Sequence, residues 1–426
     1  MKKLGFNTLA LHYGHTIDQT MSRAVPLYRT TSYLFKSAEH AENLFNLKEE
    51  GYIYTRLGNP TQDVLEKRMA ILENGKAAVA VSSGTSAIYY TIINVCKEGD
   101  EIVSSSKLYG GTYTMFNDIL PHFGIKVNFV DPLDPINFDK AITKNTKLIF
   151  TETIGNPTLD VSDIEQISKI AKKHHIPLVV DSTFTPPSIF RPLEYGANIV
   201  VHSLTKWIGG HGTAIGGIVV DGGNFDWTDP KFKLFTEPEP SYHNLVFSKD
   251  LGENNNIAFA IRLRFVPLRN LGAAISPDNA WIFLQGLETL SLRMERHCKN
   301  AIEVARFLSS HPKVEWVRYP GIETDPCYNV ARKYFNNGFG GMVVFGIKGG
   351  RSNGGKFIEN LKIFSHLANV GDAKSLAIHP ATTTHSQLTS EQLKFAGLSE
   401  SLIRLSIGIE DIDDILWDIE QSLNNI

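Results

Sequence analysis

Between Leu65 and Ser203 the chain alternates short apolar runs with longer segments of helical period, which restricts its fold more than any other feature. The short runs are rich in β-branched residues: AAVAVSS, EIVSSS, KVNFVD, KLIFTET, PLVVDST and NIVVHS. Nearly continuous apolar strands of this kind are typical of sheets that helices cover on both faces. The segment VSDIEQISKIAKKHH has the spacing of a crossover helix between two such strands. The sequence therefore predicts an α/β fold with a mostly parallel sheet.

The pattern changes past about Asp278 and divides the chain into three parts. A long helical stretch, three strand-like runs (EWVRYPG, GMVVFGIKG, LIRLSIGIE) and a terminal amphipathic helix predict a smaller α+β domain at 278–426. Residues 64–277 are expected to form the large domain, in which 222–275 have weak periodicity and several prolines and are read as a long insertion. Residues 1–63 fit neither domain and are predicted to be an arm that contributes to a neighbouring subunit.

Composition excludes several classes of function. The 426 residues carry a formal net charge of −3 with mixed signs, which argues against a partner as acidic as nucleic acid. No apolar run approaches the roughly 18–20 residues that a membrane-spanning helix needs. The three cysteines lie far apart and outside any CxxC pair, so neither a disulfide framework nor a metal site is predicted. We expect a cytoplasmic protein that acts on small molecules.

Two chemically capable residues directly follow predicted strands. Lys206 comes after NIVVHSLT and Asp181 after PLVV, so both should lie at the edge where α/β proteins bind ligands. A partly shielded lysine can lose its proton and form a Schiff base, and a carboxylate can hold a proton on a heteroaromatic nitrogen. Taken singly, a strand-end lysine is more often a solvated surface residue, and an aspartate in this position more often caps the next turn.

A third strand end supplies groups that suit a phosphate. Ser83, Gly84 and Thr85 precede a helical stretch, so their backbone N–H groups can point at an anion, and Ser203 and Thr205 add hydroxyls. A Schiff-base lysine, an acid for a ring nitrogen and a phosphate cradle together describe a pyridoxal phosphate (PLP) enzyme. A dinucleotide-binding fold is the alternative, but SSGTSA lacks the GxGxxG spacing.

Eight segments, spread over essentially the whole chain, resemble in order the signature segments of the Cys/Met-metabolism family of PLP enzymes. They are YTRLGNPT (54–61), SSGTSA (82–87), KLYGGT (107–112), GNPT (155–158), DSTFTPP (181–187), HSLTKWIGGHG (202–212), NVGDAKSLAIHPATTTH (369–385) and LIRLSIGIED (402–411). The resemblance implies the PLP-dependent transferase fold of the aspartate-aminotransferase type, with a seven-stranded sheet in the large domain. It also implies a homotetramer built from dimers that share their active sites.

The resemblance assigns roles at the cofactor ring. Lys206 is expected to be the Schiff-base lysine and proton shuttle, and Asp181 the partner of the pyridine nitrogen. Tyr109 is expected to stack on the ring, with Asn156 at the ring hydroxyl and Thr183 as a near neighbour.

Two further groups of residues follow from the resemblance. The phosphate is expected to be held by Gly84, Thr85, Ser203 and Thr205 and, from the neighbouring subunit, by Tyr54 and Arg56. The substrate carboxylate is expected to be held by Arg404, with Asn369 and Ser375 near that end of the site.

Within the family, the block at 369–385 and the length of 222–275 resemble O-acetylhomoserine sulfhydrylases. Gly111 stands where methionine γ-lyases typically have a cysteine. The resemblance thus implies γ-replacement on O-acetyl-L-homoserine, giving homocysteine, or methionine from methanethiol, and acetate in methionine biosynthesis. A cystathionine γ-synthase, a methionine or cystathionine γ-lyase and a non-catalytic binding relative are the alternatives. The sulfur source is left open among sulfide, methanethiol and a thiol on a carrier protein, as is the ester among acetyl, succinyl and phospho.

Overall fold

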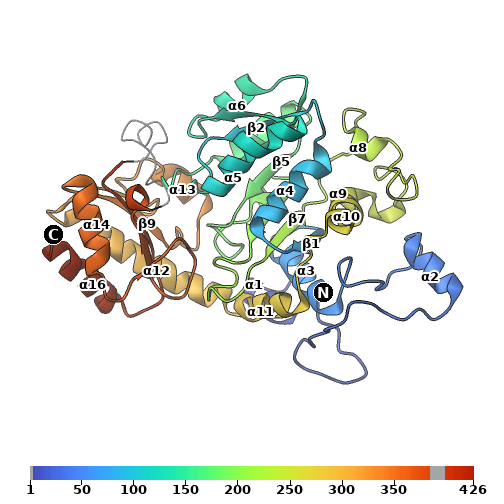
Figure 1. Ribbon diagram of the computed structural model, residues 1–426, viewed down its shortest axis with the longest axis horizontal. Coiled ribbons are helices and arrows are strands. Elements are labelled where there is room, and N and C mark those ends of the chain that lie inside the picture. The colour runs from blue at the N-terminus through green and yellow to red at the C-terminus, as the bar shows by residue number, and fades with distance from the viewer. Residues whose placement is uncertain (1–2, 384–398) are drawn as a thin grey trace.

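The computed structural model describes residues 3–383 and 399–426, and two β-sheets organise them (Figure 1). Thr384 and His385, the last residues of the block at 369–385, lie outside the described residues. The larger sheet has seven strands in the order β1-β7-β6-β5-β4-β2-β3. Its strands are β1 (Ala77–Val81), β2 (Glu101–Ser105), β3 (Lys126–Val130), β4 (Thr146–Glu152), β5 (Leu178–Asp181), β6 (Ile199–Ser203) and β7 (Gly217–Asp221).

The larger sheet is mostly parallel, as predicted, and the six predicted apolar runs form β1 to β6. Strand β7 is antiparallel to both of its neighbours, β1 and β6. The chain passes from β6 to β7 through residues 204–216 without a crossover helix, so the returning strand runs in the opposite direction. The predicted runs end with NIVVHS, so β7, which follows the glycine-rich stretch GGHGTAIGG, was not predicted.

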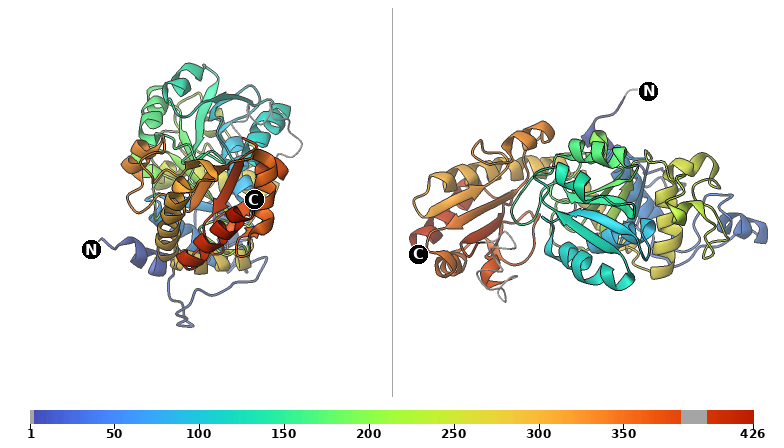
Figure 2. Two further views of the ribbon diagram at one scale, coloured as in Figure 1. Left: turned by 90° about the vertical axis from the view of Figure 1, so that its left-hand side faces the viewer. Right: turned by 90° about the horizontal axis from the view of Figure 1, so that it is seen from above.

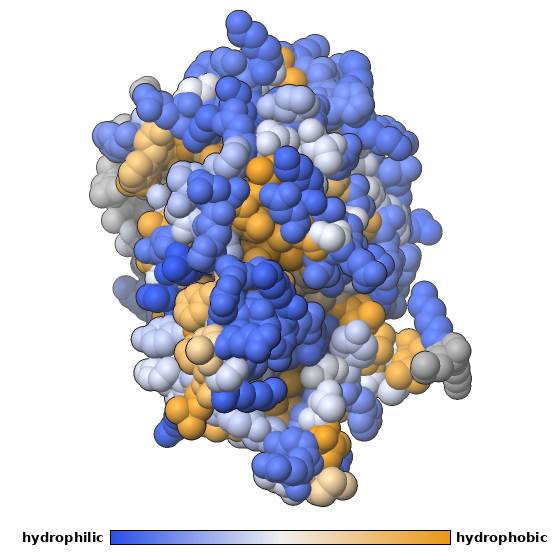
Figure 3. Space-filling model, turned by 90° about the vertical axis from the view of Figure 1, so that its right-hand side faces the viewer, coloured by the Kyte–Doolittle hydropathy of each residue, from blue (hydrophilic) through white to orange (hydrophobic). Residues whose placement is uncertain are grey.

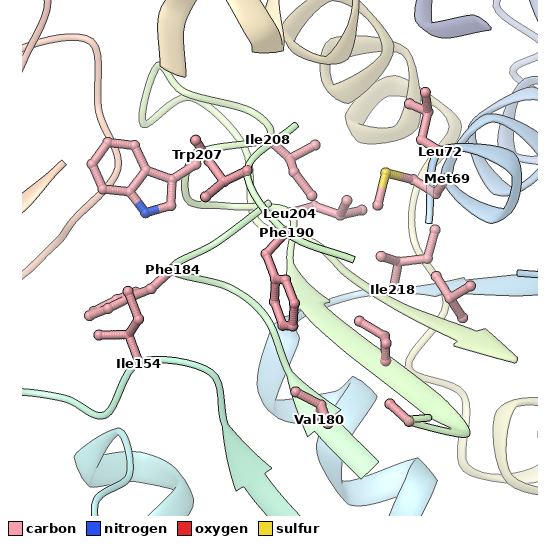
Figure 4. Packing of buried hydrophobic residues seen from close by; sticks show 14 of the residues in the cluster. Met69, Leu72, Ile154, Val180, Phe184, Phe190, Leu204, Trp207, Ile208 and Ile218 are labelled. Atoms are coloured by element: carbon pink, nitrogen blue, oxygen red, sulfur yellow. The ribbon is translucent and has the colours of Figure 1, made fainter. Parts of the chain in front are cut away.

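Helices cover both faces of the larger sheet, which confirms that expectation. Alternate strand residues enter two different cores: Ala78 and Ala80 face one, Val79 and Val81 the other. The first core receives α3 (Pro60–Leu72), α7 (Ile164–Lys173) and α11 (Pro277–Glu288), and the second receives α4 (Gly84–Val95) and α9 (Ala258–Leu263). The remaining helices around this sheet are α5 (Gly110–Thr114), α6 (Ile136–Ala141) and α8 (Lys233–Thr236). Figure 4 shows part of the first core, where Leu204, Trp207 and Ile208 pack beside Lys206.

Residues 222–275 are more ordered than their weak periodicity suggests. Their aromatic side chains are buried in the second core, with Trp227 stacked on Phe235 at 4.2 Å between ring centroids. Residues 258–271 form helix α9, a π-helical turn at 264–268 and α10 (Arg269–Leu271), although their sequence periodicity is weak. Pro267 lies inside the π turn, whose altered hydrogen-bond register accommodates a residue without an N–H.

The second sheet has five strands in the order β10-β11-β12-β9-β8. Its strands are β8 (Val314–Arg318), β9 (Met342–Ile347), β10 (Ser365–His366), β11 (Leu376–Ile378) and β12 (Leu402–Ser406). The accompanying helices are α12 (Leu290–Ser310), α13 (Tyr328–Tyr334), α14 (Gly350–Asn360) and α16 (Ile412–Asn424). The three predicted strand runs and the terminal helix are thereby confirmed, whereas the long helical stretch is two helices, α11 and α12.

The first sixty residues are mostly extended, with two short helices, α1 (Phe6–His12) and α2 (Ala38–Phe45). Helix α1 packs against α3 and α11. The segment with α2 projects from the end of the molecule that lies away from the second sheet (Figures 1 and 2). It is tied to the body where Tyr242 Oη donates to Phe45 O at 3.0 Å and Arg264 Nη1 to Leu57 O at 2.6 Å. No helix within the described residues is long and apolar enough to span a membrane.

Candidate active site

The carboxyl ends of β5 and β6 bring four predicted site residues together. Asp181 is the last residue of β5 and pairs in register with Val201 of β6. Thr183 N donates to Asp181 Oδ1 and Ser203 N donates to Thr183 Oγ1, both at 2.9 Å. Lys206 follows three residues after the end of β6. Parallel strand order thus builds this edge of the site from neighbouring strand ends.

Lys206 is sheltered, and its amine donates a hydrogen bond to Asn369 Oδ1. Burial, together with the positive charge of Arg404, lowers the pKa of Lys206 to about 8 from an ordinary value of 10.5. Near neutral pH this amine is deprotonated far more often than a surface lysine, so it is suited to attack a carbonyl and to accept a proton. Asn369 was expected near the substrate carboxylate, and the structure places it on the lysine.

Asp181 is a partly buried carboxylate without a cationic partner in the described residues. Burial raises its pKa, although bonds from Thr183 and the charge of His202 act in the opposite direction. No lysine or arginine pairs with it in the described part of the chain. A protonated pyridine nitrogen against this carboxylate would stabilise its charged form, so the site fits the nitrogen of PLP.

Glu152, which the sequence reading missed, lies beside Asp181. It is the last residue of β4 and pairs in register with Asp181. Burial, followed by the negative charge of Asp181, raises its pKa well above the ordinary value. Glu152 Oε1 accepts a hydrogen bond from Tyr109 N at 2.7 Å. The signal was available in the sequence, because Glu152 directly follows KLIFT just as Asp181 follows PLVV.

The predicted phosphate residues meet at the start of α4. The side chain of Ser83 caps this helix by accepting from Ser86 N at 3.0 Å. A Cβ on Gly84 would lie 2.7 Å from Ser203 Cβ, so only glycine allows the helix to approach β6 this closely. Thr205 Oγ1 accepts from Gly216 N at 3.1 Å. A helix N-terminus beside a serine hydroxyl favours an anion, and this cradle fits the phosphate of PLP.

The second sheet supplies the predicted carboxylate clamp. Arg404 lies on β12, and its Nη1 donates to Asn156 Oδ1 at 2.9 Å. Burial lowers the pKa of Arg404 to about 10, which leaves it positively charged at neutral pH. Asn156 was expected at the ring hydroxyl of the cofactor, and in the structure it contacts Arg404. Together with the Lys206–Asn369 bond, this contact places the site between the two sheets.

Ser375 lies behind the site. It is fully buried, and its Oγ donates to Glu410 Oε2 and accepts from Gly408 N, both at 2.9 Å. Its N–H also donates to Glu410 Oε1 at 2.6 Å. These contacts join the segment after Asn369 to the chain that leaves β12. Glu410 was not singled out by the sequence reading, although it belongs to the segment LIRLSIGIED.

Tyr109 is held at the rim by Glu152 and by an adjacent glycine. Its side chain is half exposed at the start of α5. A Cβ on Gly111 would lie 2.6 Å from Cε1 of the Tyr109 ring. Any side chain at position 111 would therefore displace the tyrosine from its position.

Tyr54 and Arg56 stand apart from these residues. Both are exposed on the extended N-terminal segment, with the Arg56 guanidinium 5.2 Å from the centre of the Tyr54 ring. Neither makes a described contact with Lys206, Gly84 or Ser203. Within one chain, the predicted phosphate site therefore lacks these two residues.

Comparisons with known proteins agree with the geometry. The family model described as Cys/Met metabolism PLP-dependent enzyme matches residues 7–424. An O-acetyl-L-homoserine sulfhydrylase from Leptospira meyeri is 56% identical over 98% of this chain and 96% of its own length. A homocysteine synthase from Schizosaccharomyces pombe is 50% identical over 98% of each chain. A crystal structure named as an O-acetylhomoserine (thiol)-lyase from Campylobacter jejuni, with an N'-pyridoxyl-lysine-5'-monophosphate residue, is 41% identical with a TM-score of 0.95 over 99% of this chain and 100% of that one.

Proposed function

The chain belongs to the Cys/Met metabolism family of PLP-dependent enzymes, and from this premise we propose that it transfers sulfur to O-acetyl-L-homoserine, forming L-homocysteine and acetate. PLP is its cofactor. The observation that carries the proposal is that the two sheets bring a sheltered lysine, Lys206, and a buried arginine, Arg404, to one site. A substrate whose carboxylate is bound by Arg404 has its Cα close to an amine that is already poised to accept a proton.

When bound, PLP supplies an electron sink for the electrons of the Cα–H bond. Arg404 holds the substrate carboxylate by two parallel hydrogen bonds, a geometry that its planar guanidinium allows. Asp181 holds a proton on the pyridine nitrogen. Lys206 would hold PLP covalently in the resting enzyme, and its amine, once freed by the substrate amine, would accept the α-proton.

Lys206 would first pass the α-proton on and so regain its neutral form, and it would then accept a second proton, from Cβ, with Tyr109 nearby. Acetate then leaves from Cγ, and hydrosulfide adds to the same carbon. The protons return to Cβ and Cα through Lys206, so one C–O bond is exchanged for one C–S bond with no net oxidation. Each of these steps uses a residue at the rim of the larger sheet.

Gly111 supports replacement over γ-elimination. The position of the Tyr109 ring depends on the absence of a side chain at residue 111, where methionine γ-lyases typically have a cysteine. The names of the similar proteins support the acetyl ester and inorganic sulfide as donor. Methanethiol and a thiol on a carrier protein remain alternative sulfur sources.

We infer that the arm completes the site of a second copy. Tyr54 and Arg56 suit a phosphate, and apolar side chains on the same segment are exposed, with Leu34 98% and Met21 76% exposed. Figure 3 shows hydrophobic surface on the side of the molecule where α2 lies. Burial of such side chains against a second chain would stabilise an oligomer. A tetramer of such dimers rests on the family resemblance alone.

The proposed organisation retains three parts: an arm at 1–63, a large PLP-binding domain at 64–277 and a smaller domain at 278–426. The three cysteines are unpaired and buried, which supports a reducing compartment, and we place the enzyme in the cytoplasm.

The test is to incubate the PLP-loaded protein with O-acetyl-L-homoserine, with and without sulfide, and to quantify homocysteine and 2-oxobutyrate together. We expect homocysteine that depends on sulfide, with little oxo acid. Oxo acid at equal rates in both tubes would identify a γ-lyase and contradict the proposal. Cystathionine formed in preference when cysteine competes with sulfide would identify a cystathionine synthase.

A further inference from the structure

Helix α12 buries three polar side chains on one face, and the proposed reaction uses none of them. Arg293, His297 and Asn300 follow the i, i+4, i+7 spacing of a helix face and are 6%, 0% and 3% exposed. Within the described residues no carboxylate pairs with the Arg293 guanidinium. Burying an unpaired charge is unfavourable unless its hydrogen bonds are satisfied, so the partners of this face identify its role.

The first partner is the turn that carries Lys206. Arg293 Nη1 donates to Trp207 O at 2.7 Å, and Nη2 donates to Ile208 O at 3.0 Å. The turn is shaped around the guanidinium, because a Cβ on Gly210, whose φ is +71°, would lie 2.0 Å from Nη1. Gly210 N in turn donates to Lys206 O at 2.7 Å. Arg293 thereby fixes the backbone of Trp207 and Ile208, the residues inside the turn that this hydrogen bond closes.

The second partner is the chain that leaves β12, the strand of Arg404. His297 Nδ1 donates to Ile407 O at 2.7 Å, because a carbonyl oxygen can only accept. Burial lowers the pKa of His297 to about 4, so the ring is neutral and this is its one N–H. Asn300 Nδ2 donates to Gly408 O at 3.1 Å and to Glu410 O at 2.9 Å. The chain leaving β12 is thus anchored only a few residues beyond the arginine.

We propose that this face of α12 sets the distance between the Lys206 amine and the Arg404 guanidinium, and that Arg293, His297 and Asn300 are positioning residues. Arg293 and Asn300 are seven residues apart, so a stiff helix separates their two partners by about 10 Å. The Trp207 ring packs against His297 at 4.8 Å between centroids and links the two ends. The inference rests on the proposed roles of Lys206 and Arg404.

The proposal predicts that variants at the two ends of the helix face differ in their kinetic effects: a change at Arg293 lowers kcat, and a change at Asn300 raises KM. Arg293→Met removes the bonds to the lysine turn, so we expect kcat to fall roughly 10- to 100-fold while KM for the ester changes less than about threefold. Arg293→Lys retains one cationic donor and should recover part of the loss. Asn300→Leu releases the chain after Arg404 and should raise KM roughly tenfold with kcat nearly unchanged. Arg296→Met, exposed on the same helix, is the matched control.

Two measurements do not depend on the reaction. The pH titration of the visible absorbance of bound PLP reports on Lys206, and we expect Arg293→Met to shift it while Asn300→Leu leaves it unchanged. The Kd of L-alanine, which has no leaving group, reports on the carboxylate clamp, and we expect Asn300→Leu to raise it roughly tenfold. These results without homocysteine formation would refute the proposed function alone. If both variants lose kcat and affinity together, in proportion to a lowered Tm, the face is merely structural and the proposal is wrong.

Discussion

The rim, that is, the carboxyl ends of β1, β5 and β6 with the residues that follow them, and the N-terminal arm (1–63) both carry residues expected to bind the same phosphate. Within one chain, only the residues of the rim come together. Gly84 and Ser203 lie in close contact because β1, β6 and the intervening β7 bring their strand ends together. Tyr54 and Arg56 lie on an extended segment that is tied to the body through Phe45 and Leu57. The difference shows which parts of a site follow from chain topology and which need a second chain.

The largest effect should come from the rim. Lys206→Ala removes both the covalent anchor and the base, so we expect homocysteine formation to fall by at least about 10³-fold, while phosphate contacts still hold some PLP. Lys172→Ala, an exposed lysine on α7, is the control. Undiminished turnover by the Lys206 variant would show that the rim does not carry the chemistry.

Asp181→Asn tests the rim without changing its shape. The amide no longer stabilises a proton on the pyridine nitrogen, so exchange of the substrate α-proton with deuterated water should slow by about 10²-fold with cofactor bound. Glu152→Gln is the matched change on the neighbouring strand. Because the raised pKa of Glu152 favours its neutral form, this variant should exchange nearly as fast as the wild type. Equal losses in both variants would mean that Asp181 has no special role.

Arg56→Ala tests the arm. A charge-assisted hydrogen bond to phosphate contributes about 1.5–3 kcal/mol, so the Kd for PLP should rise roughly 10- to 100-fold if the arm reaches a cofactor. Arg23→Ala, exposed on the same segment, should leave the Kd unchanged. Cofactor release on dilution measures both. An unchanged Kd in the Arg56 variant would assign the phosphate to the rim alone.

The smallest expected effect is a shift in the pH dependence of Lys206, which tests the influence of Arg404 on its pKa. With a pKa of about 8, Lys206 becomes deprotonated as the pH rises to this value, so covalent linkage of added PLP to the apoprotein should accelerate up to about pH 8 and then level off. Arg404→Gln removes a nearby positive charge and should move this midpoint to higher pH. A rapid-mixing absorbance series measures both. A midpoint that is unchanged or lower would contradict the coupling.

Much of the rim is predictable from sequence because strand ends follow directly from local pattern. Apolar runs predicted β1 to β6, and the parallel order then placed Asp181, Thr183 and Lys206 at one edge. Strand β7 was not predicted, because the glycine-rich stretch before it is typical of a turn. The helices at 258–271 were not predicted, because a proline such as Pro267 usually ends a helix. In the structure a π turn accommodates this proline.

Other parts of the site depend on tertiary contacts that no local pattern reveals. Ser375 sits in a motif, but its hydroxyl is used by Glu410 and Gly408 behind the site. Asn369 contacts the lysine because the two sheets meet there. In the sequence Arg293 is indistinguishable from an ordinary helix arginine, and only the structure shows that it donates to the turn after Lys206.

The comparison between rim and arm is tested most directly by mixing two defective variants. Lys206→Ala and Arg56→Ala chains are unfolded, refolded together with PLP, and assayed for homocysteine from O-acetyl-L-homoserine and sulfide. If the arm of one chain completes the rim of another, random pairing restores about one quarter of the wild-type sites, because half of the dimers are mixed and each has one intact site. Refolded mixtures no more active than the two variants alone, in parallel with wild-type chains that regain activity, would contradict a shared site.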